Sequence, residues 1–446
     1  MNDRPSAPTP CSVFDRVRAH PGAVWLDGGQ APEGWSILAW DPVEVVTDGD
    51  DWPDVGRRLS GRAQPDGLPF SSGCLGYLGY GAGHRVETVP AEPPTPEPEV
   101  WLGRFEGALC FRHRDQTWHF GGTPSFRRRA RQVLEVAVPT PVPSPARPVT
   151  ARRTTDRARY EALVRRIQGL IAAGDCYQVD LTRPVFLEGV GDPWDAFRRL
   201  RELSSPPYGA WLTLAEDLAV LSNSPELFLS VRGRHLASRP IKGTRPRGGD
   251  PTRDAALAAE LAHSEKDRAE LAMIVDLVRN DLGRVAVPGS VEALPRVLTT
   301  HANVHHTSTT VRATLEPDRD AWDALAALFP PGSVTGAPKI RACRRIAELE
   351  DSPRGVYCGA IGFVSATGEA TWSVAIRTAV ASGDRLRYHV GGGIVADSEP
   401  SAEWWETVHK GVAMERAFAA SVHRVAQDTG VALPDRTMAS LPHRST

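Results

Sequence analysis

Short apolar runs broken by glycine and proline are the main pattern in the first part of the chain. Such runs are typical of β-strands that end in turns. The clearest of them cover residues 23–26, 44–47 and 100–111. The segment 73–80 is apolar but rich in glycine, which predicts close backbone packing or a bulge. We therefore expect a β-rich N-terminal region over residues 1–138.

The second part of the chain mixes helical and strand patterns. A proline-rich linker at 139–150 precedes it, because proline can neither continue a helix nor pair in a central strand. Residues 157–173 have the spacing of an amphipathic helix, which Gly174 ends. The pattern then predicts strands at 179–186, 210–213, 219–221 and 227–231, and helices at 264–282 and 401–422. We place a second folded region at 151–430 and a tail at 431–446.

Composition and charge exclude several classes of protein. With 446 residues, of which 41% are hydrophobic and 24% charged, the chain has an ordinary globular composition with room for two or three domains. The net charge of −2 gives no support for nucleic-acid binding. No apolar run approaches the roughly eighteen residues of a membrane span. The polar N-terminus lacks the apolar core of a signal peptide, and the six scattered cysteines predict reduced thiols. We expect a cytoplasmic protein.

A single lysine, Lys242, stands in a segment rich in proline and glycine, residues 239–248. This composition predicts a turn. Arg245 and Arg247 follow closely, so the turn could bind a small anion. A partly desolvated lysine among cations has a lowered pKa, which leaves part of it as a neutral nucleophile. The alternative interpretation is a basic surface loop.

Acidic residues recur at helical spacing in the two helices expected at 264–282 and 401–422. Asp267 and Glu270 are three residues apart, as are Glu403 and Glu406. Carboxylates from two helices could hold a divalent cation such as Mg²⁺, which needs only one or two of them. The alternative is that they stabilise the first helical turns, where Ser264 and Asp267 resemble a capping box.

Glycine-rich segments do not match known nucleotide loops. Residues 332–339 lack the ending of a phosphate-binding loop, and residues 391–393 lack the dinucleotide fingerprint. Such loops more plausibly bring backbone N–H groups close to a carboxylate. The histidines at 301, 305 and 306 lack the spacing of a zinc helix, although one ring could face a ligand.

Long motifs between Tyr160 and Ala419 resemble those of the chorismate-utilising enzyme family. They are residues 174–179, 224–229, 240–244, 267–270, 275–281, 336–339, 357–362 and 391–398. The resemblance implies an α+β fold like that of anthranilate synthase, with two large, mainly antiparallel β-sheets flanked by helices. It also implies that the chain is an enzyme that binds chorismate.

The resemblance implies a role for each residue at a matching position. Glu270 and Glu406 would ligate Mg²⁺, with Asp267 and Glu403 in support. Glu226 would be the general acid that helps a hydroxyl leave ring carbon 4. The remaining catalytic or substrate-binding residues would be Gln178, Thr244, His306, Thr335, Tyr357, Arg377, Gly392, Gly393 and Lys410. Among these, Tyr357, Arg377 and the Gly393 backbone would bind the enolpyruvyl carboxylate.

Two positions indicate which reaction the chain catalyses. Relatives that add water to chorismate carry lysine where this chain has Gln178. Anthranilate synthases carry a small residue where this chain has Lys242. Lysine there is typical of members that aminate carbon 4 through a covalent lysine adduct, giving 4-amino-4-deoxychorismate for para-aminobenzoate and folate or a related aromatic-amine pathway. The alternatives are an anthranilate-forming enzyme and, more remotely, a catalytically silent chorismate-binding partner protein.

The nitrogen source is expected to lie outside this chain. No cysteine has the sequence context of a glutaminase nucleophile. Ammonia would come from solution or from a separate glutaminase subunit, which we expect to contact the N-terminal region.

Overall fold

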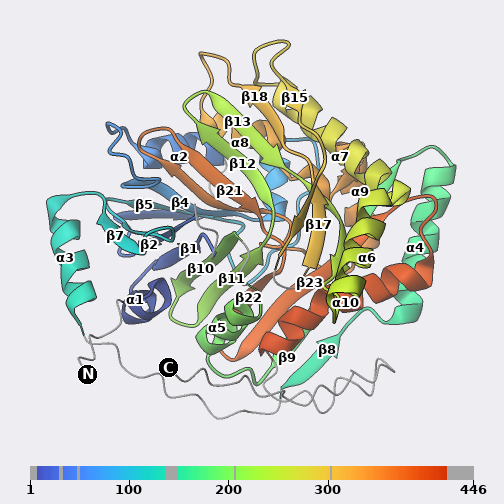
Figure 1. Ribbon diagram of the computed structural model, residues 1–446, viewed down its shortest axis with the longest axis horizontal. Coiled ribbons are helices and arrows are strands. Elements are labelled where there is room, and N and C mark those ends of the chain that lie inside the picture. The colour runs from blue at the N-terminus through green and yellow to red at the C-terminus, as the bar shows by residue number, and fades with distance from the viewer. Residues whose placement is uncertain are drawn as a thin grey trace.

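Two large β-sheets form the centre of the protein, and a small sheet lies beside them (Figure 1). The computed structural model describes residues 8–29, 34–47, 51–136, 149–204, 207–301 and 304–418. Neighbouring strands in these sheets pair antiparallel. The predicted α+β fold with two antiparallel sheets is confirmed.

The larger sheet has eleven strands and runs through both halves of the chain. Its order is β19 (Gly336–Ala337), β9 (Gln178–Glu188), β23 (Arg385–Ile394), β22 (Thr378–Ser382), β11 (Leu218–Ser224), β10 (Tyr208–Ala215), β1 (Val24–Asp27), β2 (Trp35–Ala39), β6 (Leu109–Arg112) and β7 (Thr117–Phe120), with β8 (Thr150–Arg153) paired to β9.

The second sheet has nine strands, and the small sheet has three. The nine are β15 (Glu292–Ala293), β18 (Val311–Thr314), β13 (His235–Arg239), β12 (Leu227–Arg232), β21 (Ala370–Val374), β20 (Ala360–Ser365), β4 (Gly73–Leu78), β5 (Val100–Phe105) and β3 (Glu44–Thr47). The small sheet consists of β14 (Ile241–Pro246), β17 (Val304–Ser308) and β16 (Val297–Thr300).

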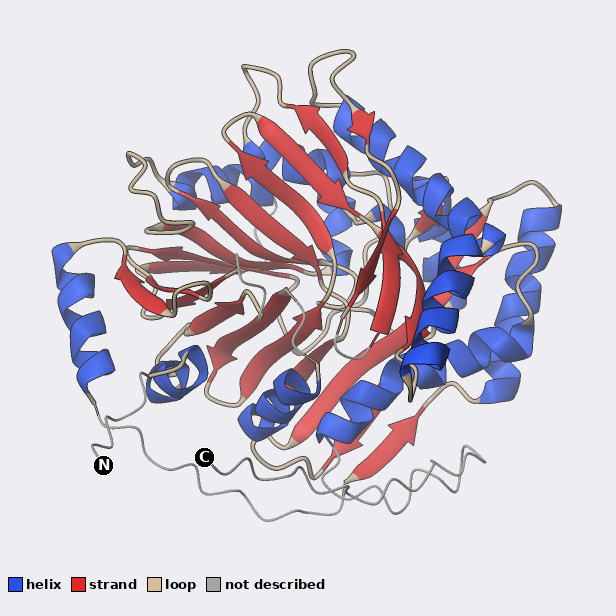
Figure 2. Ribbon diagram, in the orientation of Figure 1, coloured by secondary structure: helices blue, strands red, loops and turns tan. Residues whose placement is uncertain are grey.

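Helices cover the outside of the sheets, and several gather at one end of the molecule (Figure 2). The helices in the described part of the chain are α1 (Pro10–Val17), α2 (Trp52–Ser60), α3 (Pro124–Glu135), α4 (Arg157–Ala172), α5 (Pro193–Leu203), α6 (Pro251–His263), α7 (Glu265–Gly283), α8 (Ala321–Leu328), α9 (Lys339–Leu349) and α10 (Pro400–Phe418), with 3₁₀ turns η1 (Tyr80–Arg85) and η2 (Gly332–Val334). None of these described helices has the length and apolar character needed to cross a membrane.

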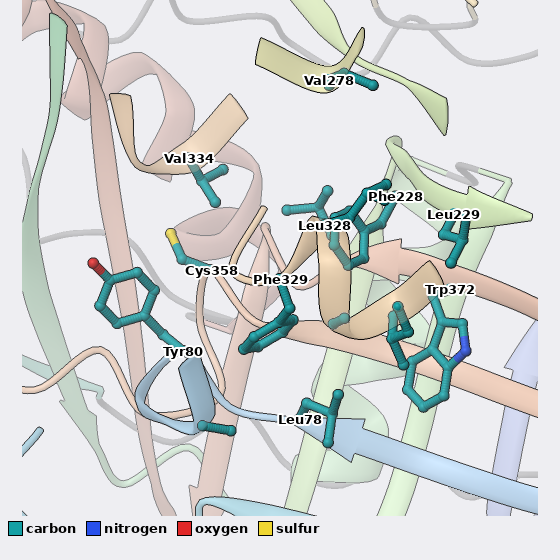
Figure 3. Close-up of a cluster of buried hydrophobic side chains, with 14 of the residues drawn as sticks. Leu78, Tyr80, Phe228, Leu229, Val278, Leu328, Phe329, Val334, Cys358 and Trp372 are labelled. Atoms are coloured by element: carbon teal, nitrogen blue, oxygen red, sulfur yellow. The ribbon is translucent and has the colours of Figure 1, made fainter. Parts of the chain in front are cut away.

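The hydrophobic core divides into layers on the faces of the sheets. One cluster, which includes Val24, Leu75 and Ile361, joins residues from both large sheets. Another lies beneath the helices that cover the nine-stranded sheet, and Figure 3 shows part of it around Phe329 and Trp372. These layers fix the positions of the loops between the sheets.

The N-terminal strands complete both large sheets and do not form a sheet of their own. Strand β1 pairs with β10 in the first sheet, and β4 pairs with β20 in the second. The boundary that the sequence suggests therefore separates two stretches of chain whose strands pair with each other. Most of the proline-rich linker (residues 139–148) and the tail at 431–446 lie outside the described residues.

Most predicted elements match observed ones within a few residues. The run at 44–47 is β3, and the predicted helix at 157–173 is α4, after which Gly174 has a φ of 75°. The glycines of β4 do allow close packing, because a Cβ on Gly76 would lie 1.9 Å from the Trp101 carbonyl oxygen. The predicted end of the last helix, beyond residue 418, lies outside the described residues.

Candidate functional site

Lys242 lies in strand β14 and not in the turn that its neighbours predict. β14 pairs with β17, and the register shifts between Lys242 and Thr244. Gly243, with a φ of 80°, is the residue at this bulge. Helices α6 and α7 pack against β14. The turn prediction is wrong because the bulge places glycine's left-handed conformation inside a strand.

The Lys242 ammonium points at the glycine-rich strand β23 and the loop before β19. Its Nζ donates a hydrogen bond to the Ser333 carbonyl oxygen at 3.2 Å. A Cβ built on Gly393 would lie 3.5 Å from Lys242 Nζ and 2.4 Å from Gln178 Nε2. A side chain at 393 would therefore displace the Gln178 amide, and the Lys242 amine lies in contact with the same position.

Gln178 has a buried amide whose hydrogen-bonding capacity is unused. The residue is fully buried, and neither Nε2 nor Oε1 has a partner within the described residues. Leaving both atoms unpaired costs free energy unless a ligand or water satisfies them. Gln178 therefore marks a polar binding site beside Lys242.

The two arginines after Lys242 are paired with carboxylates. Arg245 lies 3.0 Å from Glu260 and 3.2 Å from Asp267, and Arg247 lies 2.8 Å from Asp254. Both arginines that the sequence places near the lysine are therefore engaged in ion pairs. Sequence spacing could not show that acidic residues of α6 and α7 face them.

Glu226 precedes β12 and is almost completely buried. Burial raises the pKa of its carboxyl to about 7, while a hydrogen bond from Ser333 and the Lys242 charge act in the opposite direction. A carboxyl with this pKa keeps its proton in a large fraction of molecules near neutral pH. Glu226 can therefore donate a proton to a bound ligand.

Replacing Glu226 with glutamine should stabilise the protein at high pH. The native carboxyl, with a pKa of about 7 against 4.5 for the ordinary group, binds more protons than the unfolded one, so stability falls as pH rises from 4.5 to 7. Glutamine has no proton to lose in this pH range, so the variant does not lose this stability as the pH rises. Relative to the wild type, Glu226→Gln should gain about 3 kcal/mol of unfolding free energy between pH 4.5 and pH 8. Urea unfolding at several pH values measures the difference. Glu216 is exposed, so for the control Glu216→Gln the difference in unfolding free energy from the wild type should not change with pH. The same pH dependence in both variants would contradict the raised pKa of Glu226.

Three carboxylates and their lysine partners lie where α7 and α10 approach β23. Lys410 is 2.7 Å from Glu406 and lowers the pKa of that carboxyl. Burial raises the pKa of Glu270 and of Glu403, and Glu406 adds to both shifts. Lys266 lies 3.8 Å from Glu270 and 3.7 Å from Glu403. The carboxylates are therefore close enough to repel one another.

Two of the residues expected to bind Mg²⁺ offer the oxygen donors that a divalent cation prefers. Glu270 and Glu406 supply hard oxygen ligands from two helices, and a Cβ on Gly392 would lie 3.1 Å from Glu406 Oε1. Asp267 instead binds Arg245, while Ser264 caps α7 by accepting the Asp267 N–H. No group of three or more acidic, histidine or cysteine residues is arranged as a ready metal site in the described part of the chain. Two carboxylates are still enough for Mg²⁺ that keeps water and ligand oxygens.

A free arginine and a buried tyrosine lie near the end of β21. Arg377 has a left-handed φ of 51°, and its guanidinium makes no hydrogen bond or ion pair within the described residues. Burial lowers its pKa. Tyr357 is buried and stacks on His389 with ring centroids 5.4 Å apart. An unpaired guanidinium in a partly buried position suits a planar anion such as a carboxylate.

The other predicted site residues differ in how they are placed. His306 is buried on β17, and its Nε2 lies 3.0 Å from Nε2 of His301. Thr335 is fully buried and donates its hydroxyl to the backbone of its own loop. Lys410 donates to the Gly391 carbonyl oxygen at 2.9 Å. Thr244 is exposed on β14, in contrast to the buried His306 and Thr335.

Sequence reasoning missed two cations that organise this region. Lys266 connects two carboxylates and could have been found from its spacing of four residues to Glu270. Arg354 is fully buried and donates to the carbonyl oxygens of Val334 at 2.8 Å and Asp180 at 2.7 Å. Nothing in the sequence distinguishes this buried arginine from a surface one.

Comparison with known proteins identifies relatives of this chain by sequence and by fold. The sequence profile described as chorismate binding enzyme matches residues 28–416. Aminodeoxychorismate synthase component 1 of Klebsiella aerogenes is 43% identical over 409 residues, covering 89% of this chain and 88% of that protein. Anthranilate synthase component 1 of Streptomyces coelicolor is 39% identical, covering 88% and 82%. The crystal structure of anthranilate synthase component I from Streptococcus pneumoniae TIGR4 matches with a TM-score of 0.78 at 31% identity, covering 86% of this chain and 92% of that chain.

Proposed function

The chain belongs to the family of chorismate binding enzymes, and we propose that it is an aminodeoxychorismate synthase component 1, which converts chorismate and ammonia to 4-amino-4-deoxychorismate. One observation carries the proposal: the amine of Lys242 lies beside Gly393 and the unpaired amide of Gln178. Glu226, an acid with a pKa of about 7, is close enough for the Lys242 charge to lower that pKa.

The proposed reaction consists of two displacements that shift both ring double bonds and then return them. Lys242 Nζ, as the neutral amine, bonds to ring carbon 2, and the hydroxyl leaves carbon 4 as water with the proton of Glu226. Ammonia then bonds to carbon 4, the bond between Lys242 and carbon 2 breaks with its electrons returning to the amine, and a proton from the new ammonium group returns to Glu226. The net change is chorismate plus ammonia giving the amino product plus water.

The carboxylates of the substrate would be held by the cationic groups around Lys242. Arg377 and Tyr357 would bind the enolpyruvyl carboxylate, because that guanidinium is unpaired and partly buried. Lys410 would approach the ring carboxylate. Glu270 and Glu406, supported by Asp267 and Glu403, would hold Mg²⁺. The metal would supply a positive charge that binds the ring carboxylate and offsets the repulsion between the glutamates.

Anthranilate formation is the second candidate, because the relative from Streptomyces coelicolor and the structure from Streptococcus pneumoniae are anthranilate synthases. In that reaction, ammonia bonds to carbon 2 directly. Anthranilate synthases carry a small residue where this chain has Lys242, which would leave room for that ammonia molecule. We therefore favour amination at carbon 4.

Product analysis tests the proposal. Chorismate, Mg²⁺ and ammonium should give a non-aromatic amine that becomes para-aminobenzoate only after aminodeoxychorismate lyase is added. Glutamine should replace ammonium only when a separate glutaminase, component 2, is present. An ortho-amino aromatic product without lyase would favour anthranilate synthase. No turnover under either condition would favour a silent chorismate-binding partner.

A further inference from the structure

Two histidine rings meet at the small sheet that carries Lys242. His301 follows β16 and His306 lies on β17, and their Nε2 atoms are 3.0 Å apart. The ring centroids are 4.4 Å apart with an interplanar angle of 47°. Two nitrogens at this distance share one hydrogen, so one ring donates and the other accepts.

Backbone and side-chain contacts hold His301 in this position. Its N–H donates to the Val304 carbonyl oxygen at 2.8 Å, and its own carbonyl oxygen accepts from Arg247 at 2.9 Å. Arg247 in turn binds Asp254 through two nitrogens, each at 2.8 Å. Asp254 also lies 2.9 Å from Nε2 of His305. This chain of contacts fixes the segment that carries the His301 ring.

Both rings are held neutral at physiological pH. Burial, then the neighbouring ring, and then Arg377 and Arg239 lower the pKa of His306 to about 4, and the same arginines and burial lower that of His301. A neutral imidazole carries one N–H, and the hydrogen bond at one nitrogen decides which nitrogen has it. With Nε2 of His306 engaged, Nδ1 is the ring nitrogen that has no partner within the described residues.

We propose that His301 is a positioning residue: the hydrogen bond between the two Nε2 atoms holds the His306 ring in one orientation and one tautomer and leaves Nδ1 for the ligand. The inference rests on the proposed function in one respect. There, Nδ1 of His306 would form a hydrogen bond with the hydroxyl that leaves carbon 4. The tautomer itself is a property of the protein without substrate.

Histidine-labelled protein tests the tautomer directly. In ¹⁵N spectra of the substrate-free enzyme near pH 7, His306, assigned through His306→Gln, should show a single neutral tautomer. His301→Phe keeps the ring volume but removes the hydrogen-bond partner, so the two tautomers of His306 should mix. His301→Gln retains an amide that can take the place of the imidazole and should restore the wild-type spectrum. A mixture of tautomers at His306 in the wild type, or a spectrum unchanged in His301→Phe, would overturn the proposal.

Kinetics provide the second measurement. His301→Phe should lower kcat with chorismate, Mg²⁺ and ammonium by roughly 10-fold, while KM for chorismate changes less than about twofold and His301→Gln recovers most of the rate. His235→Phe, which replaces an exposed imidazole on β13, is the matched control and should keep wild-type kinetics. A wild-type kcat in His301→Phe would contradict the positioning role. If the wild-type enzyme makes no aminated product but the spectra behave as expected, the proposed function fails and the tautomer assignment stands.

Discussion

Replacing Lys242 with methionine is expected to reduce formation of the carbon-4 amino product by about 1000-fold or more, because the side chain that would form the adduct loses its nucleophile. Methionine keeps much of the apolar stem, and the one hydrogen bond lost is to the Ser333 carbonyl oxygen. The fold should therefore survive. The loss of the ammonium should also raise the pKa values of Glu226 and Glu270, since its charge lowers both.

Intact-protein mass spectrometry distinguishes a nucleophile from a charged neighbour. After chorismate and Mg²⁺ are added without ammonia, the wild type should gain mass at Lys242, and Lys242→Met should not. Lys266→Met is the matched control, because it removes a lysine that also faces the carboxylates but is not proposed to bond to substrate. A Lys242→Met enzyme that makes the amino product at near wild-type rate would show that the lysine acts only through its charge or packing.

Loss of either proposed metal ligand should have a comparably large effect. Glu270→Gln and Glu406→Gln are each expected to lower kcat/KM by about 100- to 1000-fold, since one carboxylate on a divalent cation is removed in each. Excess chelator should abolish turnover by the wild type. Because amides keep the shape of the carboxylates, folding should be retained.

Metal binding can be measured independently of turnover. Calorimetric titration with Mg²⁺, or electron paramagnetic resonance with Mn²⁺, should show weakened binding in both variants. Glu265→Gln changes an exposed carboxylate on the same helix as Glu270 and should bind metal like the wild type. Full turnover in chelator, or unchanged metal affinity in both variants, would show that these carboxylates serve another purpose.

The sequence predicts elements well wherever a local rule decides the structure. Gly174 ends α4, and the run at 44–47 is a strand, because each depends on nearby residues. The prediction of a turn at Lys242 is wrong for a nonlocal reason. Pairing with β17, some sixty residues later in the sequence, makes a segment rich in glycine and proline into a bulged strand. Local propensity is overridden when a partner strand supplies hydrogen bonds.

The sequence selects the residues of the candidate site but does not show which charges surround them. The motifs select Lys242 and Glu226, yet the partners that set their charge lie far away in sequence. Arg245 is neutralised by Glu260 and Asp267, which no spacing rule connects to it. His301 contacts His306 because a hairpin folds one ring over the other.

Because the N-terminal strands pair with strands from much later in the chain, this protein cannot be folded piece by piece as it is synthesised. Strand β4 must wait for β20, whose first residue, Ala360, is made long after Leu78 ends β4. At typical translation rates that interval is roughly 15 to 60 s. During it, β4 can pair only with β5, so its apolar side chains stay partly uncovered and the nascent chain is exposed to aggregation.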